Sequence, residues 1–337
     1  MHTPCSTLRL LALLALGAPL AGACEPEPDV VLYSAFERER CEPLVRRFEL
    51  EHGLLARVEY QSPSSALALA QRLREDRDRP RCDVFWNDEI ARTVELAEDG
   101  LFASYDSPRA AGIPEEYRDP GRRWTGCAAR ACVLVVNTNL ADPSEIRGVR
   151  DLLDPRWQGK ACMARPLSGT PLAHAAALYV ALGATGARGF FRALQGAGVN
   201  FVRTNAQVVS LVREGRMVLG LADTDEVERA GSELEIVFPD QDGGFAGGAL
   251  VLPCSVAVVA GAPHPEAARE LADFLLSIES EAQLARSKRA RLPLRAEVSR
   301  PVAVRSLAEL RRMPVDPARL AAEIERRLPE LERMFVH

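Results

Sequence analysis

The sequence predicts an α/β protein built of two lobes. Its 337 residues are enough for about two domains, and its 47% hydrophobic and 26% charged residues match ordinary globular proteins. Strand-like and helical patterns alternate along the chain, which is typical of a mostly parallel sheet covered by helices. The net charge of −5 at pH 7 provides no basic field for a polyanion, so nucleic acid is not expected as a partner.

The N-terminal residues predict export. Residues 1–23 contain one basic residue, Arg9, followed by an apolar run and then small residues, as in a signal peptide. The apolar run is shorter than the ~20 residues that a membrane-spanning helix needs. The ending Ala21-Gly22-Ala23-Cys24 resembles a lipobox, so Cys24 is expected to carry lipid, with a soluble exported form as the alternative. Residues 24–29 then form a lipidated N-terminus and spacer, and the protein is expected to be periplasmic or extracytoplasmic.

The cysteines are informative because an exported protein can form disulfides. Six remain after cleavage and lipidation: Cys41, Cys82, Cys127, Cys132, Cys162 and Cys254. Disulfides persist outside the cytoplasm, so at least one is expected, although their pairing does not follow from the sequence. The alternative is that several serve as small buried apolar residues. No CxxC pair occurs, so the spacing of a zinc site is absent.

The first lobe is expected over residues 30–127. Apolar runs and helical spacing alternate there three times. The expected strands are Val30–Tyr33, Arg57–Tyr60 and Cys82–Phe85, and the expected helices are Cys41–Glu51, Ser64–Glu75 and Glu89–Glu98. Residues 106–125 are rich in Pro, Gly and Arg and are expected to form a connection.

The second lobe is expected over residues 128–252, and residues 253–337 are expected to return to the first lobe. The expected strands are Ala131–Val136, Val218–Leu221, Leu234–Phe238 and Leu250–Val259. A helix opens at residues 166–170 and is expected to stop at Gly183. The C-terminal region holds expected helices at Pro265–Ser277, Ser280–Ser287 and Pro317–Met334, the last with Asp316 as its N-cap, and these pack on both lobes.

One candidate site is the start of a helix. Ser168, Gly169 and Thr170 precede Pro171 and an apolar helix, so backbone N–H groups and hydroxyls converge at a helix N-terminus and favour an anion. The alternative is that Thr170 is simply an N-cap. Asn205 stands in a similar but weaker position before a later helix.

A second candidate is a set of carboxylates that follow predicted strands. Asp223, Thr224 and Asp225 follow one strand, Asp88 another, and Glu37 the first. Oxygen ligands of this kind suit a hard cation or an ammonium group. The alternatives are an acidic first helical turn and, for Glu37, a solvated charged face. Neighbouring residues expected to line the same cleft are Tyr33, Ser34, Trp86 and Asn87.

Signatures of catalysis are missing from the sequence. It contains no GxSxG, HExxH, GxxxxGK[ST] or GxGxxG motif, and no nucleophile with an evident base. We therefore expect a protein that is not an enzyme, and name no catalytic residue.

The order of eight segments resembles the extracellular solute-binding proteins of ABC importers, in particular the ferric-iron-binding group of family 1. The segments are VLYSAFERE, DVFWNDE, WTGCAARACVLVVNT, DLLDPRWQGK, PLSGT, TNAQVVSLVREGRMVLGL, PHPEAARELADFLLSIESEAQLA and RLPLRAEV. The resemblance implies a type II periplasmic-binding-protein fold, with a ligand cleft between two lobes that hinge near residues 126–132 and 250–256. It also implies a monomer that captures a small solute by closure and delivers it to a membrane permease with its ATPase.

The resemblance also assigns site residues and shows where this chain departs from the iron-binding pattern. Glu37 stands where the group often has histidine, Asp88 matches its glutamate, and Thr224 and Asp225 replace its adjacent tyrosines. The elements that resemble its anion subsite are retained at Ser168, Gly169, Thr170 and Asn205.

Two ligand classes fit this implied site. Ferric iron or another hard metal ion with a synergistic phosphate- or carbonate-type anion is the first expectation. A small organic phosphate, phosphonate or zwitterion is the alternative ligand. A separate alternative concerns the partner: the protein could be a receptor that feeds a sensor instead of a permease.

Overall fold

The computed structural model describes residues 27–60, 66–227, 233–301 and 304–336. The predicted signal peptide and Cys24 lie outside the described residues. Within them, no helix is both long and apolar enough to cross a membrane.

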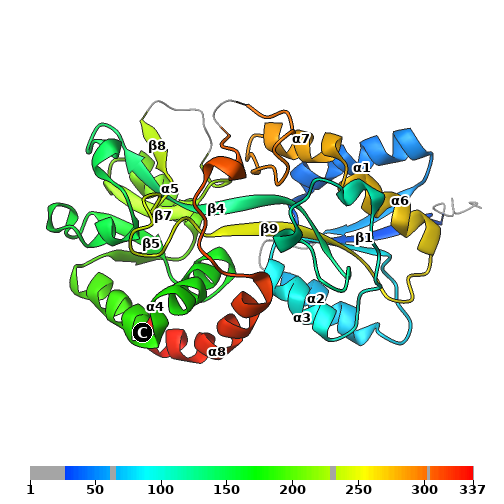
Figure 1. The fold of residues 1–337 in the computed structure, drawn as a ribbon, viewed down its shortest axis with the longest axis horizontal. Helices are drawn as coiled ribbons and strands as arrows, with labels where there is room; N and C mark the ends of the chain where they lie inside the picture. The colour runs from blue at the N-terminus through cyan, green and yellow to red at the C-terminus, as the bar shows by residue number, and fades with distance from the viewer. Residues whose placement is uncertain (1–26, 61–65, 228–232, 302–303, 337) are drawn as a thin grey trace, which may run out of the picture.

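A mixed sheet runs through both lobes (Figure 1). Its strands follow the order β2-β1-β3-β9-β4-β7-β5-β6, and β8 pairs with β4. They span β1 Val30–Ser34, β2 Ala56–Tyr60, β3 Val84–Asn87, β4 Thr125–Asn137, β5 Ala161–Ala164, β6 Asn200–Val202, β7 Leu219–Asp223, β8 Leu234–Val237 and β9 Val251–Val258. The pairs of β1 with β2 and β3 and of β5 with β6 and β7 are parallel. Both predicted lobes therefore contain the expected parallel strands, and the antiparallel pairs belong to β4 and β9.

Helices cover the sheet on both faces. They span α1 Arg38–His52, α2 Ala66–Glu75, α3 Ile90–Glu98, α4 Gly169–Gly196, α5 Asn205–Arg213, α6 Pro265–Leu275, α7 Ile278–Arg286 and α8 Pro317–Phe335. In α1, Cys41, Leu44, Val45 and Phe48 are buried, which is the helical spacing that the sequence shows.

The last helix joins the two lobes. Asp316 caps α8 as predicted, since its side chain accepts a hydrogen bond from the Arg319 backbone N–H at 2.8 Å. The helix packs against α4 in one lobe and α3 in the other (Figure 1).

Strands β4 and β9 cross between the lobes. They pair antiparallel, with Arg130 opposite Leu252 and Ala131 opposite Val251. The predicted lobe boundaries at residues 127/128 and 252/253 fall inside these two strands. Strand β4 pairs with β9 over residues 125–131 and with β7 and β8 over residues 132–137, so it contributes to both halves of the sheet.

Helix α4 departs from its predicted end. The expected stop at Gly183 is present as a break, because this residue has φ 69° and ψ 168°. The helix resumes beyond it and continues to Gly196, a segment that the sequence pattern did not predict. Gly186 and Gly189 lower the helix propensity of that segment, so its apolar packing decides its conformation.

The disulfide expected from the cysteine count is absent among the described residues. All six cysteines there are free and buried. They are spread over α1, the approach to β3, β4, β5 and β9, and they pack with the two hydrophobic clusters of the core. The prediction was wrong because these residues act as small apolar side chains.

Candidate functional site

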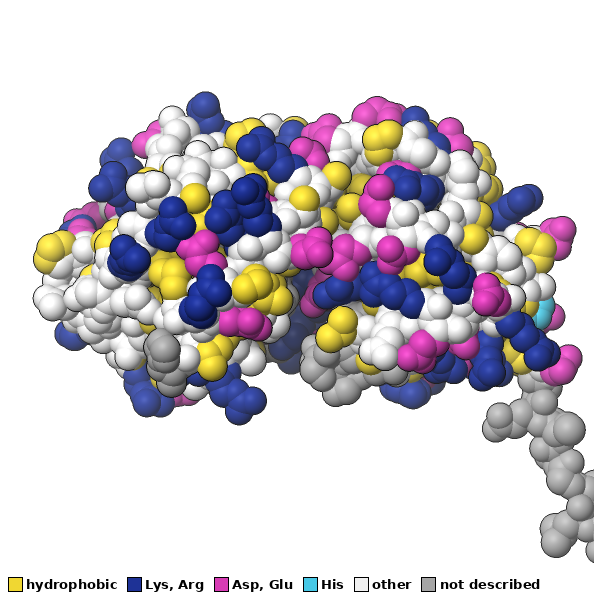
Figure 2. Space-filling view, turned by 90° about the horizontal axis from the view of Figure 1, so that it is seen from below, with side chains coloured by type: hydrophobic (Ala, Val, Ile, Leu, Met, Phe, Trp, Pro, Cys, Tyr) yellow, Lys and Arg dark blue, Asp and Glu magenta, His cyan; other side chains and the backbone are white. Residues whose placement is uncertain are grey.

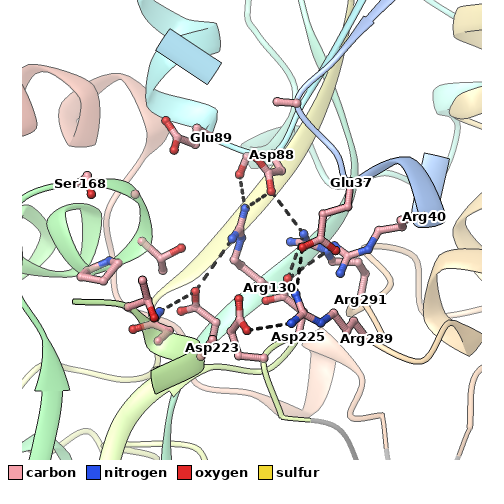
Figure 3. Close-up of a pocket in the computed structure, with 18 of the residues that line it drawn as sticks. Glu37, Arg40, Asp88, Glu89, Arg130, Ser168, Asp223, Asp225, Arg289 and Arg291 are labelled. Atoms are coloured by element: carbon pink, nitrogen blue, oxygen red, sulfur yellow. Dashed lines mark hydrogen bonds and ion pairs between the residues drawn. The ribbon is translucent and has the colours of Figure 1, made fainter. Parts of the chain in front are cut away.

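A cavity of about 370 Å³ is lined by residues of both lobes. Its lining comes from the ends of strands β1, β3 and β7, from the starts of helices α4 and α5, and from the loops beside them. Its lining residues are Ala35, Glu37, Arg40, Asp88, Glu89, Arg130, Ser168, Gly169, Thr170, Pro171, Arg203, Thr204, Asn205, Ala206, Asp223, Asp225, Glu226, Arg289 and Arg291. Figure 3 shows that the labelled charged side chains converge on one another.

Most of the candidate residues named from the sequence meet at this cavity. They are Glu37, Asp88, Asp223, Asp225, Ser168, Gly169, Thr170 and Asn205. Ligands of such sheets bind beyond the carboxyl ends of strands, where loops and helix starts gather, and these residues occupy those positions. Their roles in binding remain predictions.

Thr224 does not belong to the cavity lining. Its side chain is buried, and its Oγ1 accepts a hydrogen bond from the Ala131 backbone N–H at 3.2 Å. Its own backbone N–H donates to the Ala131 carbonyl. Thr224 therefore fastens the end of β7 to β4.

The four expected cleft-lining residues lie in the core instead, which corrects the expectation. Tyr33, Ser34, Trp86 and Asn87 are fully buried. The Trp86 ring stacks on Phe36 with centroids 4.2 Å apart, and its Nε1 donates to the Cys127 Sγ at 3.3 Å. Asn87 donates to the Glu89 carbonyl and to the Thr93 hydroxyl. Helices cover both faces of β1 and β3, so both sets of alternating side chains are buried.

The cavity is also lined by five arginines that were not predicted from the sequence. They are Arg40, Arg130, Arg203, Arg289 and Arg291. Arg40 stands three residues after Glu37 among alternating charges that are typical of a solvated face, yet its side chain is only 8% exposed. Arg130 carried a usable signal, because it is a single charge within the apolar strand β4. Arg203, Arg289 and Arg291 stand in loop sequence and carry none.

These arginines neutralise the carboxylates of the site. The Asp225 Oδ2 lies 3.0 Å from the Arg291 Nη2 and 3.5 Å from the Arg40 Nη1. The Asp88 Oδ2 lies 2.7 Å from the Arg130 Nη2 and 3.5 Å from the Arg291 Nη2. Gathered carboxylates need cations, and the protein supplies cations from its own side chains.

Asp223, Glu37 and Glu226 also have polar partners within the lining. The Asp223 Oδ2 accepts a hydrogen bond from the Asn205 Nδ2 at 2.9 Å and lies 3.9 Å from the Arg130 Nη1. Arg289 bridges two further acids, with its Nη1 3.1 Å from the Glu37 Oε1 and its Nη2 3.3 Å from the Glu226 Oε2.

The acids of the cavity differ in how readily they ionise. Burial raises the pKa of Asp223 and outweighs the opposing charge of Arg130. Asp225 is also buried, but Arg291, Arg130 and Arg40 together hold its pKa below the ordinary value. Burial and the neighbouring Asp88 raise the pKa of Glu89. Asp225 therefore keeps its negative charge more firmly than Asp223 and Glu89.

The start of α4 keeps free groups that suit an anion. Ser168 precedes the helix with extended backbone and makes no side-chain capping hydrogen bond. Gly169 has φ 56°, a left-handed conformation that side chains rarely adopt, and thus turns the chain into the helix. Exposed N–H groups at a helix start attract negative charge.

No group of three or more His, Cys, Asp or Glu side chains is placed to hold a metal ion within the described ranges. The acids of the cavity are separated by the arginines that pair with them. Acidic and basic side chains are also interspersed on the outer surface of both lobes, on the face that Figure 2 shows from below.

Comparison with known proteins agrees with this architecture. Residues 93–318 match the family model described as "Bacterial extracellular solute-binding protein". A similar curated protein is "Iron uptake protein A1" of Synechocystis sp., which is 27% identical over 80% of this chain and 77% of its own.

Solved structures show the same fold. Iron-bound HitA from Pseudomonas aeruginosa has 25% identity and a TM-score of 0.77 over 90% of this chain and 98% of its own. AfuA from Actinobacillus pleuropneumoniae, with exogenous fructose-6-phosphate bound, has 18% identity and a TM-score of 0.74 over 90% and 97%.

The two-lobe fold is confirmed by these neighbours and by a family match that covers more than half of the chain. The resemblance inferred from the ordered sequence segments is confirmed as well. The chain belongs to the bacterial extracellular solute-binding proteins.

Proposed function

We propose that this protein is the substrate-binding component of an ABC importer, and that it captures a small anionic solute between its lobes for delivery to a membrane permease. The observation that supports the anion is the set of five arginines that line the cavity together with the helix start at Ser168–Thr170. A solute-binding role without chemistry on the ligand accords with the family. A sensor in place of the permease is the alternative partner.

Ferric iron bound together with an anion is the first ligand class. It is supported by the name of the Synechocystis relative and by the iron-bound HitA structure. Asp88, Asp223 and Asp225 offer the hard oxygen atoms that such an ion prefers. Because arginines already pair with these carboxylates, the ion would enter with an anion that completes its coordination and balances the arginine charge.

A small organic phosphate or phosphonate is the second class, and the arginines favour it specifically. Guanidinium groups match phosphate and carboxylate oxygens through paired hydrogen bonds. The paired acids leave no group of metal-binding side chains in the described part of the cavity. The geometry therefore supports the anion more directly than the metal.

Equilibrium dialysis tests the function and separates the two classes. Metal-stripped mature protein is dialysed against ferric citrate, with and without phosphate, and bound iron and phosphorus are measured. One iron per chain, held more tightly with phosphate, supports iron capture with an anion. Bound phosphorus without iron supports the organic class, and binding of neither contradicts the proposal.

A pair of variants locates the binding site. Arg130→Gln is expected to weaken anion binding at least tenfold, because it removes the guanidinium between Asp88 and Asp223. Arg156→Gln is the matched control, since Arg156 is half exposed and pairs with Glu145 and Asp154 outside the cavity. Equal effects of both changes in calorimetry would contradict the assignment.

We also propose that Cys24 carries a lipid that tethers the protein to a membrane. The signal-like residues before it support this. A Cys24→Ser form is expected to move from the membrane fraction to the soluble fraction while keeping its ligand affinity. Retention of the variant in the membrane fraction would contradict the tether.

A further inference from the structure

Three buried arginines line the cavity: Arg40 and Arg291 on the side away from Ser168, and Arg130 at its centre. Their side chains are 8%, 12% and 1% exposed, so their charges are largely removed from water. The guanidiniums of Arg40 and Arg291 lie 5.9 and 5.4 Å from the centroid of the Phe36 ring, which packs beneath both. We call these three residues the arginine cluster.

The cluster has more donors than its partners use. A guanidinium carries five N–H donors. Arg291 gives its hydrogen bonds from Nη2, and its Nε and Nη1 have no partner. The Arg130 Nε also lacks a partner, and its Nη1 is 3.9 Å from Asp223, beyond hydrogen-bonding distance. Buried donors without acceptors are costly, which favours an acceptor brought by the ligand.

Charge in the cavity points the same way. Five arginines face six acids in the lining: Glu37, Asp88, Glu89, Asp223, Asp225 and Glu226. Burial raises the pKa of Asp223, Glu89 and Glu226, so these three acids are the least able to keep their negative charge. The five arginines thus offset nearly all of the negative charge in the lining, so an anion does not meet an uncompensated acidic cavity.

The cluster is distinct from the helix start that already suits an anion. Ser168 belongs to the lobe that contains α4, whereas Arg40 belongs to α1 and Arg291 follows α7. In the view of Figure 3, Ser168 and the pair of Arg40 and Arg291 lie on opposite sides, with Arg130 between them.

We propose that the arginine cluster is a second anion subsite, so that the ligand is a small organic acid with two acidic groups: a phosphate or phosphonate at the start of α4 and a carboxylate at Arg40, Arg130 and Arg291. The inference rests on the proposed function, since it takes the cavity as the ligand site. A two-acid ligand would contact both lobes at once and thereby favour their closure. The arginine cluster would also disfavour a zwitterion, because the ammonium group of that ligand would face guanidinium groups.

Three phosphonates that differ in their second functional group test the inference by calorimetry on the full mature protein. Methylphosphonate has only the phosphonate, phosphonoacetate adds a carboxylate, and 2-aminoethylphosphonate adds an ammonium. We expect phosphonoacetate to bind at least tenfold more tightly than methylphosphonate, and 2-aminoethylphosphonate to bind no better than methylphosphonate. Equal affinities for the first two, or preference for the ammonium compound, would overturn the second subsite but leave anion capture intact. Binding of none of the three contradicts both anion capture by this cavity and the inference.

A variant on α1 tests the residues. Arg40→Gln is expected to weaken phosphonoacetate binding at least tenfold more than it weakens methylphosphonate binding, and so to remove the advantage of phosphonoacetate. Arg47→Gln is the control on the same helix, because Arg47 bonds to Gln283 and Ser280 outside the cavity. Circular dichroism checks that both variants fold. An unchanged ratio in Arg40→Gln would overturn the assignment.

Discussion

Asp225 illustrates how the site works at the scale of residues. From the sequence it is one of three polar residues in a row and a candidate ligand for a cation. In the structure its Oδ2 is shared by Arg291 and Arg40, and these guanidiniums hold its pKa low despite burial. The residue's charge is therefore matched within the protein, and the ligand has to satisfy the arginines as well as the acids.

Removing one partner of the buried pair of Arg291 and Asp225 is expected to destabilise the fold. Arg291→Met removes the nearest cation from Asp225 and one of the two cations beside Asp88, leaving Arg40 and Arg130 in place. It should lower the free energy of unfolding by less than the roughly 3–5 kcal/mol that a fully uncompensated buried charge costs. The double variant Arg291→Met/Asp225→Asn should lose less than the sum of its single variants, because it removes both charges. Urea unfolding of the four proteins measures the coupling, and strict additivity would contradict a direct pair.

His174 gives the stability a defined pH dependence. It is fully buried in α4, and burial lowers its pKa from 6.5 to about 4. The folded protein thus keeps a neutral imidazole where the unfolded chain takes up a proton. The free energy of unfolding should be unaffected above about pH 7, fall as the pH drops from 6.5 towards 4, and be lower by about 2 kcal/mol at pH 5.

The variant His174→Leu isolates this contribution. Its urea-unfolding free energy should fall less between pH 7 and pH 5 than that of the unchanged protein, since it has no group to protonate there. Parallel pH profiles for the two proteins would show that His174 is not responsible.

At the scale of elements, helix α4 depends on a glycine in its interior. Gly183 has backbone angles that are essentially restricted to glycine, so Gly183→Ala should destabilise the protein by about 1–3 kcal/mol. Gly189→Ala is the matched control: it lies in the same helix without unusual φ, and a Cβ there meets no atom within 4 Å. This second change should stabilise the protein by about 0.5–1 kcal/mol. Similar thermal shifts of the same sign would contradict the role of the break.

The buried cysteines provide a second prediction at this scale. Burial raises the pKa of the Cys41 and Cys162 thiols to about 12, so both are expected to be unreactive in the folded protein. A mature Cys24→Ser form should show no thiol reactive to Ellman's reagent when folded and six in guanidinium chloride. Its melting temperature should not change with reductant. Fewer than six thiols after unfolding would reveal a disulfide.

At the scale of the whole molecule, β4 and β9 run between the lobes and place Arg130 at the cavity. The residues predicted to hinge lie within or next to these strands. Closure is therefore expected to bring the helix start of α4 towards the acids and arginines of the other lobe.

Small-angle X-ray scattering measures this closure. The anion that binds in dialysis should reduce the radius of gyration of the protein at saturating concentration. The Arg130→Gln variant should show no reduction at the same concentration, because it binds weakly. An unchanged radius for the unaltered protein with bound ligand would contradict capture by closure.

The sequence by itself determined the two-lobe α/β fold, the approximate places of most strands and helices, and the family. These features depend on local periodicity, on the N-cap Asp316 and on residues such as Asp88, Ser168 and Asp223 that follow strands or open helices. Such signals lie within a few neighbouring residues and are readable without contacts.

Only the tertiary structure decided what surrounds those residues. Arg291 is far from Asp225 in the chain, and no local pattern marks their pairing at 3.0 Å. Tyr33 and Trp86 are likewise buried in the core and do not line the cleft. Their burial depends on helices from other parts of the chain that cover both faces of β1 and β3. The sequence therefore located the acids and the helix start, whereas long-range packing supplied the arginines that set the charge of the site.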